Sequence, residues 1–196
     1  LPVAAHGRRE TQGEVFARLL GDEVCLGGMM MTEPGCGTDV LRAETQITPT
    51  AGGFRVQGMK HWSGHTGHAD YWLVFGSRPG GSRAQSRGYV VAEARAGGGP
   101  SVQGAGDPFR VEEYYSAWGL QPIPYGRTRV DARVPEAAWL GEEKTYTEVL
   151  GGVLTGSRLT FAGPCHGAIR GILITRQQGI KVVRTTLLIA GCDILQ

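Results

Sequence analysis

The densest group of side chains able to bind a ligand lies in residues 31–39, which read Met-Thr-Glu-Pro-Gly-Cys-Gly-Thr-Asp. Pro34-Gly35 is a turn signal, and Gly37 has no Cβ, so a ligand can approach the backbone closely there. Thr32 and Thr38 place hydroxyl groups, which can donate and accept hydrogen bonds, on either side of the turn. The stretch predicts a glycine-rich loop that could cradle a phosphate or the polar edge of a ring. An ordinary surface turn of the same composition is the alternative.

Three histidines close together in the sequence, His61, His65 and His68, suggest a second kind of chemistry. Their intervals of four and three residues would align them on one face of a helix, as in zinc sites. Gly64 and Gly67 interrupt this segment, however, and each glycine disfavours a helix interior by about 1 kcal/mol. We therefore expect the histidines to line a surface loop, and we assign no metal site to them.

The composition excludes several broad classes of function. The chain has 196 residues, of which 41% are hydrophobic, and this is enough for a core of ordinary size. A formal net charge of +2 is too small to favour binding to nucleic acid, and no apolar run is long enough to span a membrane. The first residues do not resemble a signal peptide, and the cysteines are scattered, at Cys25, Cys36, Cys165 and Cys192. We therefore expect free thiols and a cytoplasmic location.

Short β-strand patterns surround these candidate sites. Between residues 41 and 130, β-branched and aromatic residues alternate with polar ones in runs of a few residues. Glycine and proline turns separate the runs, at residues 51–53, 78–81, 96–100 and 121–124. Many short strands with such punctuation predict a β-barrel or a sandwich. Residues 24–31 are interpreted as the strand that leads into the glycine-rich loop.

Helical patterns flank the β region on both sides. Four apolar residues share one helical face over residues 14–20, with Gly21 as the expected left-handed cap, whereas residues 1–13 show no period and predict a loose entry. From residue 142 onward, apolar residues return to helical spacing. We expect a kink or a break at Gly163-Pro164, because proline costs about 3 kcal/mol in a helix interior.

Four motifs follow one another along the chain. They are Thr32-Glu33-Pro34 with Gly37-Thr38-Asp39, then Gln57-Gly58-Met59-Lys60-His61-Trp62, then Ala69-Asp70 before an apolar strand, and finally Val134-Pro135 with Leu140-Gly141. Their order and spacing resemble the middle domain of the acyl-CoA dehydrogenase and acyl-CoA oxidase superfamily, over roughly residues 25–167. Gln57 and Thr38 replace the asparagine and serine of that pattern, and residues 116–120 lack both charges of its Lys-x-Gly-x-Arg turn.

The resemblance implies an α+β fold, with an antiparallel β-barrel middle domain flanked by remnants of two helical domains. It places the end of an N-terminal helical domain at residues 1–27, the barrel at 28–141 and the start of a truncated C-terminal helical domain at 142–196. The chain begins with Leu1 and stops early relative to the family pattern. We therefore expect a fragment or a truncated member.

The resemblance also implies a site for FAD in the crevice between barrel and helices. The implied cofactor-binding residues are Met29, Met31, Thr32, Gly37 and Thr38 in the strand and loop, and Trp62, Ser63 and Gly64 after the second motif. Thr32 would bond the ring edge, and Thr38 would lie near both the pyrophosphate and the acyl-CoA. Arg158 would lie near the CoA part of the substrate. The alternatives are core packing for Trp62 and a solvated helix face for Arg158.

The implied reaction is α,β-dehydrogenation of an acyl-CoA thioester, in which a glutamate removes the α-proton and the β-hydrogen leaves as hydride to the flavin. The catalytic residue of this chain is unknown. Ser157 stands where one branch of the family has its base, and an unactivated serine is a poor base. Glu33 is interpreted as a structural residue that bonds the loop.

Two alternative functions stay open. Trp62-Ser63-Gly64 also resembles the acyl-CoA oxidase version of the motif, so an oxidase-like enzyme is one of them. The other is a non-catalytic relative that binds acyl-CoA or a protein. The resemblance further implies a homo-oligomer, and a location in the mitochondrial matrix if the source is eukaryotic.

Overall fold

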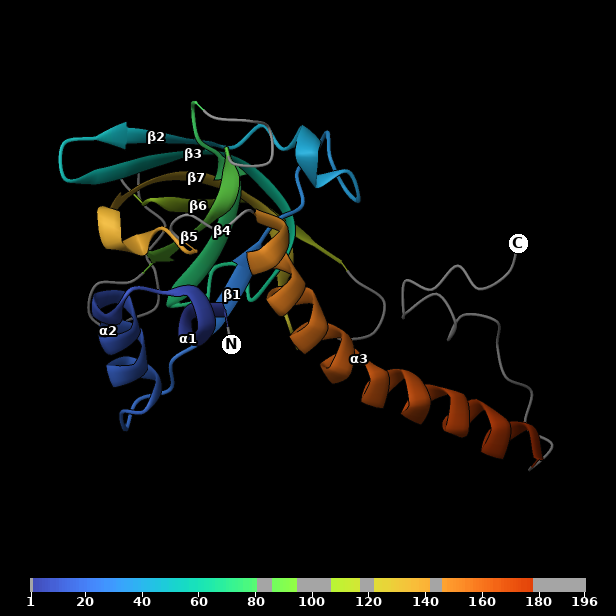
Figure 1. Cartoon of the computed structure of the whole chain (residues 1–196). Helices are drawn as coiled ribbons and strands as arrows, with labels where there is room; N and C mark the ends of the chain where they lie inside the picture. The colour runs from blue at the N-terminus through green and yellow to red at the C-terminus, as the bar shows by residue number, and fades with distance from the viewer. Residues whose placement is uncertain (1, 81–85, 95–106, 117–121, 142–145, 178–196) are drawn as a thin grey trace. The chain divides into compact units, whose positions relative to one another are not determined.

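The computed structural model describes residues 2–80, 86–94, 107–116, 122–141 and 146–177 (Figure 1). In the last of these ranges the description excludes the side chains of residues 153, 156–161, 164 and 172–177. The chain divides into two compact units, Leu1–Gly152 and Val153–Gln196. All strands of the described residues lie in the first unit, which therefore positions the candidate site.

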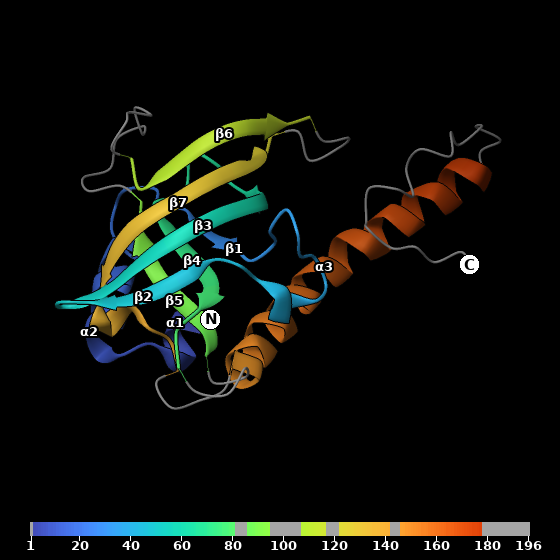
Figure 2. The same ribbon diagram turned by 90° about the horizontal axis from the view of Figure 1, so that it is seen from above.

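In the part of the chain that the structure describes, seven strands form one sheet. In chain order they are β1 (Gly27–Met30), β2 (Gln46–Thr50), β3 (Gly53–Gly64), β4 (Tyr71–Ser77), β5 (Arg87–Glu93), β6 (Phe109–Tyr115) and β7 (Tyr125–Pro135). The order across the sheet is β1-β4-β2-β3-β7-β6, and β5 pairs with β4. Figure 2 shows β2, β3, β7 and β6 side by side as one curved layer. This half-barrel with few helices confirms the predicted α+β fold class.

The sheet is mixed rather than antiparallel throughout. Most neighbouring strands are antiparallel, but β1 runs parallel to β4 over four residue pairs, and β2 meets β4 in parallel at a single pair, Gln46 and Ser77. β1 and β2 thus follow one another along the same edge of β4. Residues 31–45 leave the sheet between β1 and β2. The predicted glycine-rich loop therefore begins beside β4, at the point where its pairing changes from β1 to β2.

Alternation along the strands explains which residues form the core. In β7, Gly126, Thr128, Val130, Ala132 and Val134 are buried, and the residues between them are more exposed. This is the period of two expected for a strand with one face toward a core. One buried cluster gathers such residues from β2, β3, β4, β5 and β7. A second cluster contains Val15, Phe75 and Tyr89 and extends to Val149.

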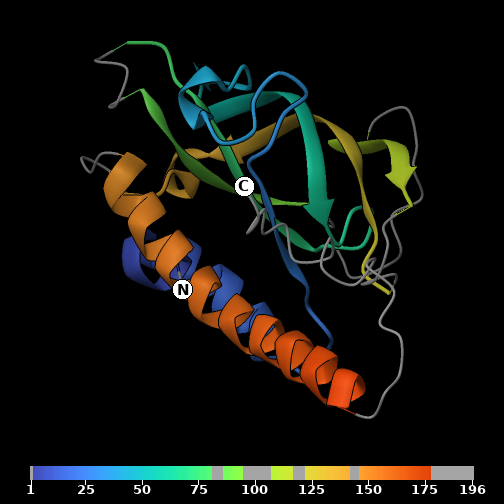
Figure 3. The ribbon, with the colours of Figure 1, turned by 90° about the vertical axis from the view of Figure 1, so that its right-hand side faces the viewer.

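Two helices at the N-terminus correct the expectation of a loose entry over residues 1–13. α1 (Pro2–His6) and α2 (Arg9–Leu19) lie on one side of the sheet (Figure 1, Figure 3). Long-range contacts order this segment, because the Thr11 hydroxyl donates to the Ala137 carbonyl (2.6 Å) in the short 3-10 helix η2 (Glu136–Ala138) and Val15 is buried. The spacing of apolar residues within residues 1–13 cannot reveal contacts with residues so distant in the sequence.

The end of α2 also differs from the prediction. Leu20 is the C-cap with φ −100°, and Gly21 does not adopt the left-handed conformation expected of it. Of the four apolar residues predicted to share a face, Val15 is buried, whereas Leu19 is exposed and Leu20 is 85% exposed. The apolar face of α2 is therefore narrower than its sequence suggests.

The helix predicted after residue 142 is present as α3 (Tyr146–Gln177). It stays continuous through Gly163-Pro164, so of the predicted kink or break the break is absent. The lost hydrogen bond and the ring clash of one proline do not end the helix here. Among the described residues, no helix is both long and apolar enough to cross a membrane.

Candidate functional site

The predicted turn in residues 31–39 is present. The Glu33 amide donates to the Cys36 carbonyl (3.0 Å) and the Cys36 amide donates back to the Glu33 carbonyl (3.1 Å), which closes the chain around Pro34-Gly35. Glu33 and Cys36 are buried, whereas Gly37 and Thr38 are exposed. The loop therefore has a fixed base and an accessible tip.

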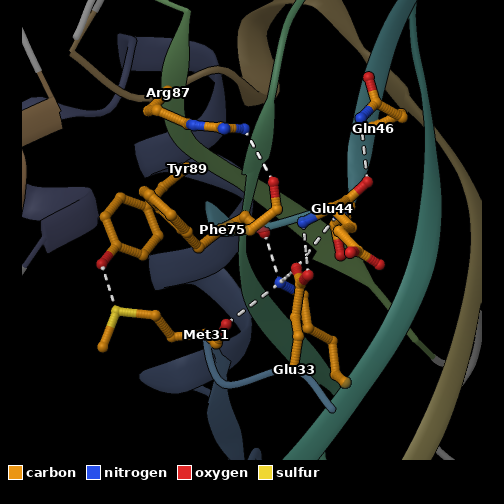
Figure 4. A network of polar contacts seen from close by, with 10 residues as sticks. Met31, Glu33, Glu44, Gln46, Phe75, Arg87 and Tyr89 are labelled. Carbon is orange, nitrogen blue, oxygen red and sulfur yellow. Dashed lines mark hydrogen bonds and ion pairs between the residues drawn. The ribbon is translucent and has the colours of Figure 1, made fainter. Parts of the chain in front are cut away.

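A buried ion pair anchors the base of this loop. Lys60 in β3 has no exposed side-chain surface, and its Nζ lies 2.7 Å from Glu33 Oε1. The same Nζ donates to the carbonyls of Met31 (3.3 Å) and Phe75 (2.6 Å). The Glu33 carboxylate in turn accepts the amides of Glu44 (2.5 Å) and Thr45 (3.2 Å). Figure 4 shows Glu33, Met31, Glu44 and Phe75 converging on these contacts.

The ion pair stands where β1 ends and β2 has not yet begun. Met31, Phe75 and Glu44 therefore have backbone groups without a strand partner, and buried backbone groups must be bonded. Lys60 and Glu33 supply those bonds. Burial raises the pKa of the Glu33 carboxyl, but the Lys60 charge and the donated hydrogen bonds outweigh burial and hold this pKa below its usual value. These contacts agree with the structural role predicted for Glu33.

A second cation secures the return of the loop to the sheet. The Arg87 guanidinium, from β5, donates to the carbonyls of Ala43 (2.9 Å) and Leu41 (2.6 Å). These carbonyls lie at the end of the short 3-10 helix η1 (Val40–Arg42). Arg87 and Tyr89 both appear beside the Glu33 network in Figure 4. The loop is thus held at both ends while its tip stays open.

β3 carries an irregularity just after Lys60. Lys60 pairs with Thr128 and Ser63 pairs with Gly126, so β3 has one residue more than β7 over this stretch. Such a β-bulge re-aims side chains. Trp62 lies in the bulge with φ +54° and is 57% exposed. A bulky residue in this left-handed region costs on the order of 1–3 kcal/mol, and such strain is concentrated at functional sites.

Three contacts hold the bulge residues His61 and Trp62. The Tyr115 ring, from the end of β6, lies with its centroid 4.5 Å from that of Trp62. The Tyr115 hydroxyl lies 3.1 Å from His61 Nδ1. The His61 amide donates to the Thr32 carbonyl (2.8 Å). The bulge therefore joins the glycine-rich loop on one side and β6 on the other.

The structure brings some of the predicted cofactor residues together and assigns others to packing. Thr32 and Trp62 are neighbours through the His61 amide, and Gly37 and Thr38 are exposed at the loop tip. Met29 and Met31 are partly buried and pack against the second core cluster, where Met31 Sδ accepts the Tyr89 hydroxyl (3.2 Å).

Ser63 and Gly64 follow Trp62 but present little surface. Ser63 is buried, and its Oγ has no hydrogen-bond partner among the described residues. Gly64 is half-buried. Arg158 and Ser157 belong to α3, but their side chains lie outside the described residues, as does most of the turn at residues 116–120.

The three histidines do not share a helix. The His65 carbonyl accepts the amides of His68 (2.9 Å) and Ala69 (3.0 Å) in a turn, so these two histidines lie in a loop as predicted. His61 does not, because it belongs to β3, where pairing with β7 extends the strand up to the bulge. Among the described residues, no group of three histidine, cysteine or carboxylate side chains is placed to hold a metal ion.

Sequence reasoning missed Tyr115 altogether. The only local signal was the pair Tyr114-Tyr115 at the end of a strand, and it does not reveal that β7 separates β6 from β3. The Lys60–Glu33 pair was also unforeseen, although both residues belong to the motifs, because they are 27 positions apart.

The family of this chain follows from comparison with known proteins. The sequence profile described as "Acyl-CoA dehydrogenase, middle domain" matches residues 28–132. An acyl-CoA dehydrogenase from Geobacillus kaustophilus has a similar fold, with a TM-score of 0.74 and 20% identity over 90% of this chain and 44% of that chain. Butyryl-CoA dehydrogenase from Megasphaera elsdenii has a TM-score of 0.74 and 19% identity over 94% of this chain and 46% of that chain.

A third solved structure contains a cofactor. It is a glutaryl-CoA dehydrogenase from Mycobacterium smegmatis in complex with FADH2, with a TM-score of 0.72 and 19% identity over 92% of this chain and 44% of that chain. At such identities the likeness is one of fold, and this chain spans less than half the length of each of the three structures. Since the profile covers more than half of the chain, the chain belongs to the acyl-CoA dehydrogenase family.

Proposed function

We propose that the chain binds FAD where the loop of residues 31–39 meets the bulge at Trp62, as part of an enzyme that dehydrogenates acyl-CoA thioesters. The observation that carries the proposal is the exposed indole of Trp62, held at φ +54° beside the Thr32 backbone. A strained and exposed aromatic side chain is costly to keep unless it faces a ligand. The FADH2-containing relative supports the same cofactor for this fold.

The donors of the loop suit the cofactor. Within the described part of the chain, the hydroxyls of Thr32 and Thr38 and the amides of Gly37 and Thr38 donate to no other group. Apart from its two neighbours in the chain, no described residue has an atom within 4 Å of the position that a Cβ on Gly37 would take, so the tip is open to a bulky ligand. Such donors fit a pyrophosphate and the polar edge of a ring.

We assign each part of the surface a role toward FAD. Trp62 would cover the ring with its flat apolar face, Thr32 would bond the ring edge, and Gly37 with Thr38 would bond the pyrophosphate. Bound FAD supplies the hydride acceptor, which the protein itself lacks. Lys60 and Glu33 would hold the loop base in place, and Arg158 would contact the CoA part of the substrate.

A second candidate function is a relative that binds acyl-CoA or a protein partner without turnover. Ser157 favours this candidate. By the resemblance it stands where one branch of the family has its catalytic base, and an unactivated hydroxyl is a poor base. An oxidase-like enzyme is the third candidate, and it shares the proposed FAD site. Reduction of a dye acceptor by acyl-CoA in the presence of the purified chain separates the enzymes from the silent relative.

The FAD site is tested by quenching of flavin fluorescence. Thr38→Val and Trp62→Ala should each weaken FAD binding tenfold or more. For Thr38→Val the reason is a lost hydrogen bond to a charged phosphate, about 1.5–3 kcal/mol. For Trp62→Ala it is the lost apolar burial of the indole together with an aromatic contact of about 0.5–1.5 kcal/mol. Thr48→Val on β2 and Leu20→Ala at the end of α2 change exposed residues away from the loop and should leave the affinity unchanged. Equal affinity across all variants would remove the physical basis of the proposal.

A further inference from the structure

The conformation of Trp62 needs support from outside β3. The bulge at residues 61–62 has one residue without a partner on β7, and the ladder resumes only at Ser63. The Thr66 hydroxyl donates to the Ser63 carbonyl (2.6 Å) and closes the segment that follows. Neither the pairing of β3 with β7 nor the bond from Thr66 involves the Trp62 side chain. They therefore do not determine where the indole points.

Tyr115 is the side chain that touches both residues of the bulge. Its ring centroid lies 4.5 Å from that of Trp62, and the two planes are inclined at 44°. Its hydroxyl lies 3.1 Å from His61 Nδ1, and the two rings meet edge to face at 5.8 Å. Since β7 lies between β3 and β6, Tyr115 reaches across one strand to make these contacts.

We propose that Tyr115 is a positioning residue for the FAD site: its ring supports the indole of Trp62, and its hydroxyl fixes His61 beside it. The inference rests on the proposed function, because it assumes that Trp62 faces the flavin. Tyr115 itself is only partly exposed and is not assigned a contact with the cofactor. It acts through Trp62 and His61.

The bond to His61 depends on the protonation state of the ring. When neutral His61 carries its proton on Nε2, Nδ1 accepts the Tyr115 hydroxyl proton. When Nδ1 carries a proton, it donates instead and the hydroxyl oxygen accepts, so only the hydroxyl proton must turn away. The contact between the two side chains therefore keeps its partners and changes its donor with the protonation state of His61.

The charges around His61 favour its neutral form. Burial lowers the pKa of His61 from 6.5, the nearby Arg127 guanidinium on β7 lowers it further, and Glu113 on β6 opposes both. The loop contributes the Thr32 carbonyl, which accepts the His61 amide. Within the described residues, His61 Nε2 is buried without a hydrogen-bond partner. At neutral pH His61 is therefore mainly neutral, so the Tyr115 hydroxyl can donate to its Nδ1.

The test compares FAD affinity, measured by flavin fluorescence between pH 5.5 and 8, in wild type, Tyr115→Phe and Tyr115→Ala. Tyr115→Ala should weaken binding about threefold to tenfold at pH 8, as expected for the loss of an aromatic pair. Tyr115→Phe keeps the ring but loses the hydroxyl contact with His61, so its affinity should lie between those of wild type and Tyr115→Ala. Tyr114→Phe, on the same strand, is the matched control and should behave as wild type.

A readout without FAD makes the outcome decisive. The imidazole of His61, titrated by NMR, should have a pKa below 6.5 in wild type and a different pKa in Tyr115→Phe, because the ring loses the hydroxyl that contacts its Nδ1. An unchanged His61 pKa, or Tyr115 variants whose affinity and pH profile match wild type, would overturn the positioning role. Equal FAD affinity of Trp62→Ala and wild type would instead overturn the proposed function. If Tyr115→Ala does not fold, Tyr115→Phe alone decides the question.

Discussion

Glu33 and Lys60, two single residues, form an ion pair on which the whole loop depends. Glu33 resembles a catalytic carboxylate in its setting of glycines and threonines, but it is buried and bonded to Lys60, Glu44 and Thr45. A buried carboxylate that accepts from three such donors is poorly placed to take a proton from a substrate. Its role is to bond the Glu44 and Thr45 amides just before β2 begins, while Lys60 bonds the carbonyls of Met31 and Phe75.

Removing one partner of this pair should be costly. Lys60→Met leaves the Glu33 charge buried and leaves the Met31 and Phe75 carbonyls without the Lys60 donor. We expect the free energy of unfolding to fall by about 3–5 kcal/mol, as for other broken buried ion pairs. Urea denaturation followed by tryptophan fluorescence measures the loss.

The double variant Glu33→Gln/Lys60→Met is the control for this prediction. It removes both charges, so its loss of stability should be smaller than the sum of the two single losses. A Lys60→Met protein within about 1 kcal/mol of wild type would show that water or another group replaces the ammonium.

Among the strands and helices, the position of β1 decides where the loop begins. This strand is short, and two of its four residues are glycines, yet it occupies the edge of β4 beside a large core side chain, Trp72. A Cβ on Gly28 would overlap Cζ3 of the Trp72 ring and lie 2.7 Å from Cε3. The neighbouring Gly27 has open space at the same position. Close approach to the indole, rather than turn formation, thus explains the glycine at position 28.

These two glycines form a matched pair for mutation. Gly28→Ala should lower the free energy of unfolding by about 1–3 kcal/mol, because Trp72 must shift within a packed core. Gly27→Ala should leave stability unchanged or raise it slightly, since it reduces the freedom of the unfolded chain. Thermal denaturation of both variants measures the difference. Equal effects would mean that β1 does not pack on Trp72 as described.

At the scale of the whole molecule, the two buried clusters of the described residues belong to the first unit. Both buried clusters are built from residues between Val15 and Val149, with Leu150 packed against the second of them. The unit Leu1–Gly152 therefore contains the apolar burial that stabilises the sheet and holds the loop. The candidate FAD residues of strand and loop lie in the same unit.

A chain ending at Gly152 should consequently fold. We expect a cooperative thermal transition whose midpoint lies within a few degrees of that of the 196-residue chain. Circular dichroism gives the midpoint, and the fluorescence of the buried Trp72 and Trp139 reports on the core. A shortened chain without a cooperative transition would show that residues after 152 contribute to the core.

Features that depend on neighbouring residues could be predicted from the amino-acid sequence. The Pro34-Gly35 turn, the alternation in β7 and the loop containing His65 and His68 were all predicted, and all are present. Turn chemistry and strand alternation act over a few positions, so they can be read locally. The order of the motifs along the chain likewise indicated the family.

Which distant residues meet, by contrast, depends on the packing of the folded chain. The partnership of Lys60 with Glu33, the reach of Tyr115 to Trp62 and the ordering of residues 2–19 all depend on which strand lies beside which. A strand's pattern shows which face it buries, but not its neighbour or its register. Many pairings of such strands satisfy the same alternation, and the packing of the whole core selects among them. The candidate loop could therefore be found in the sequence, whereas the side chains that hold it in place could not.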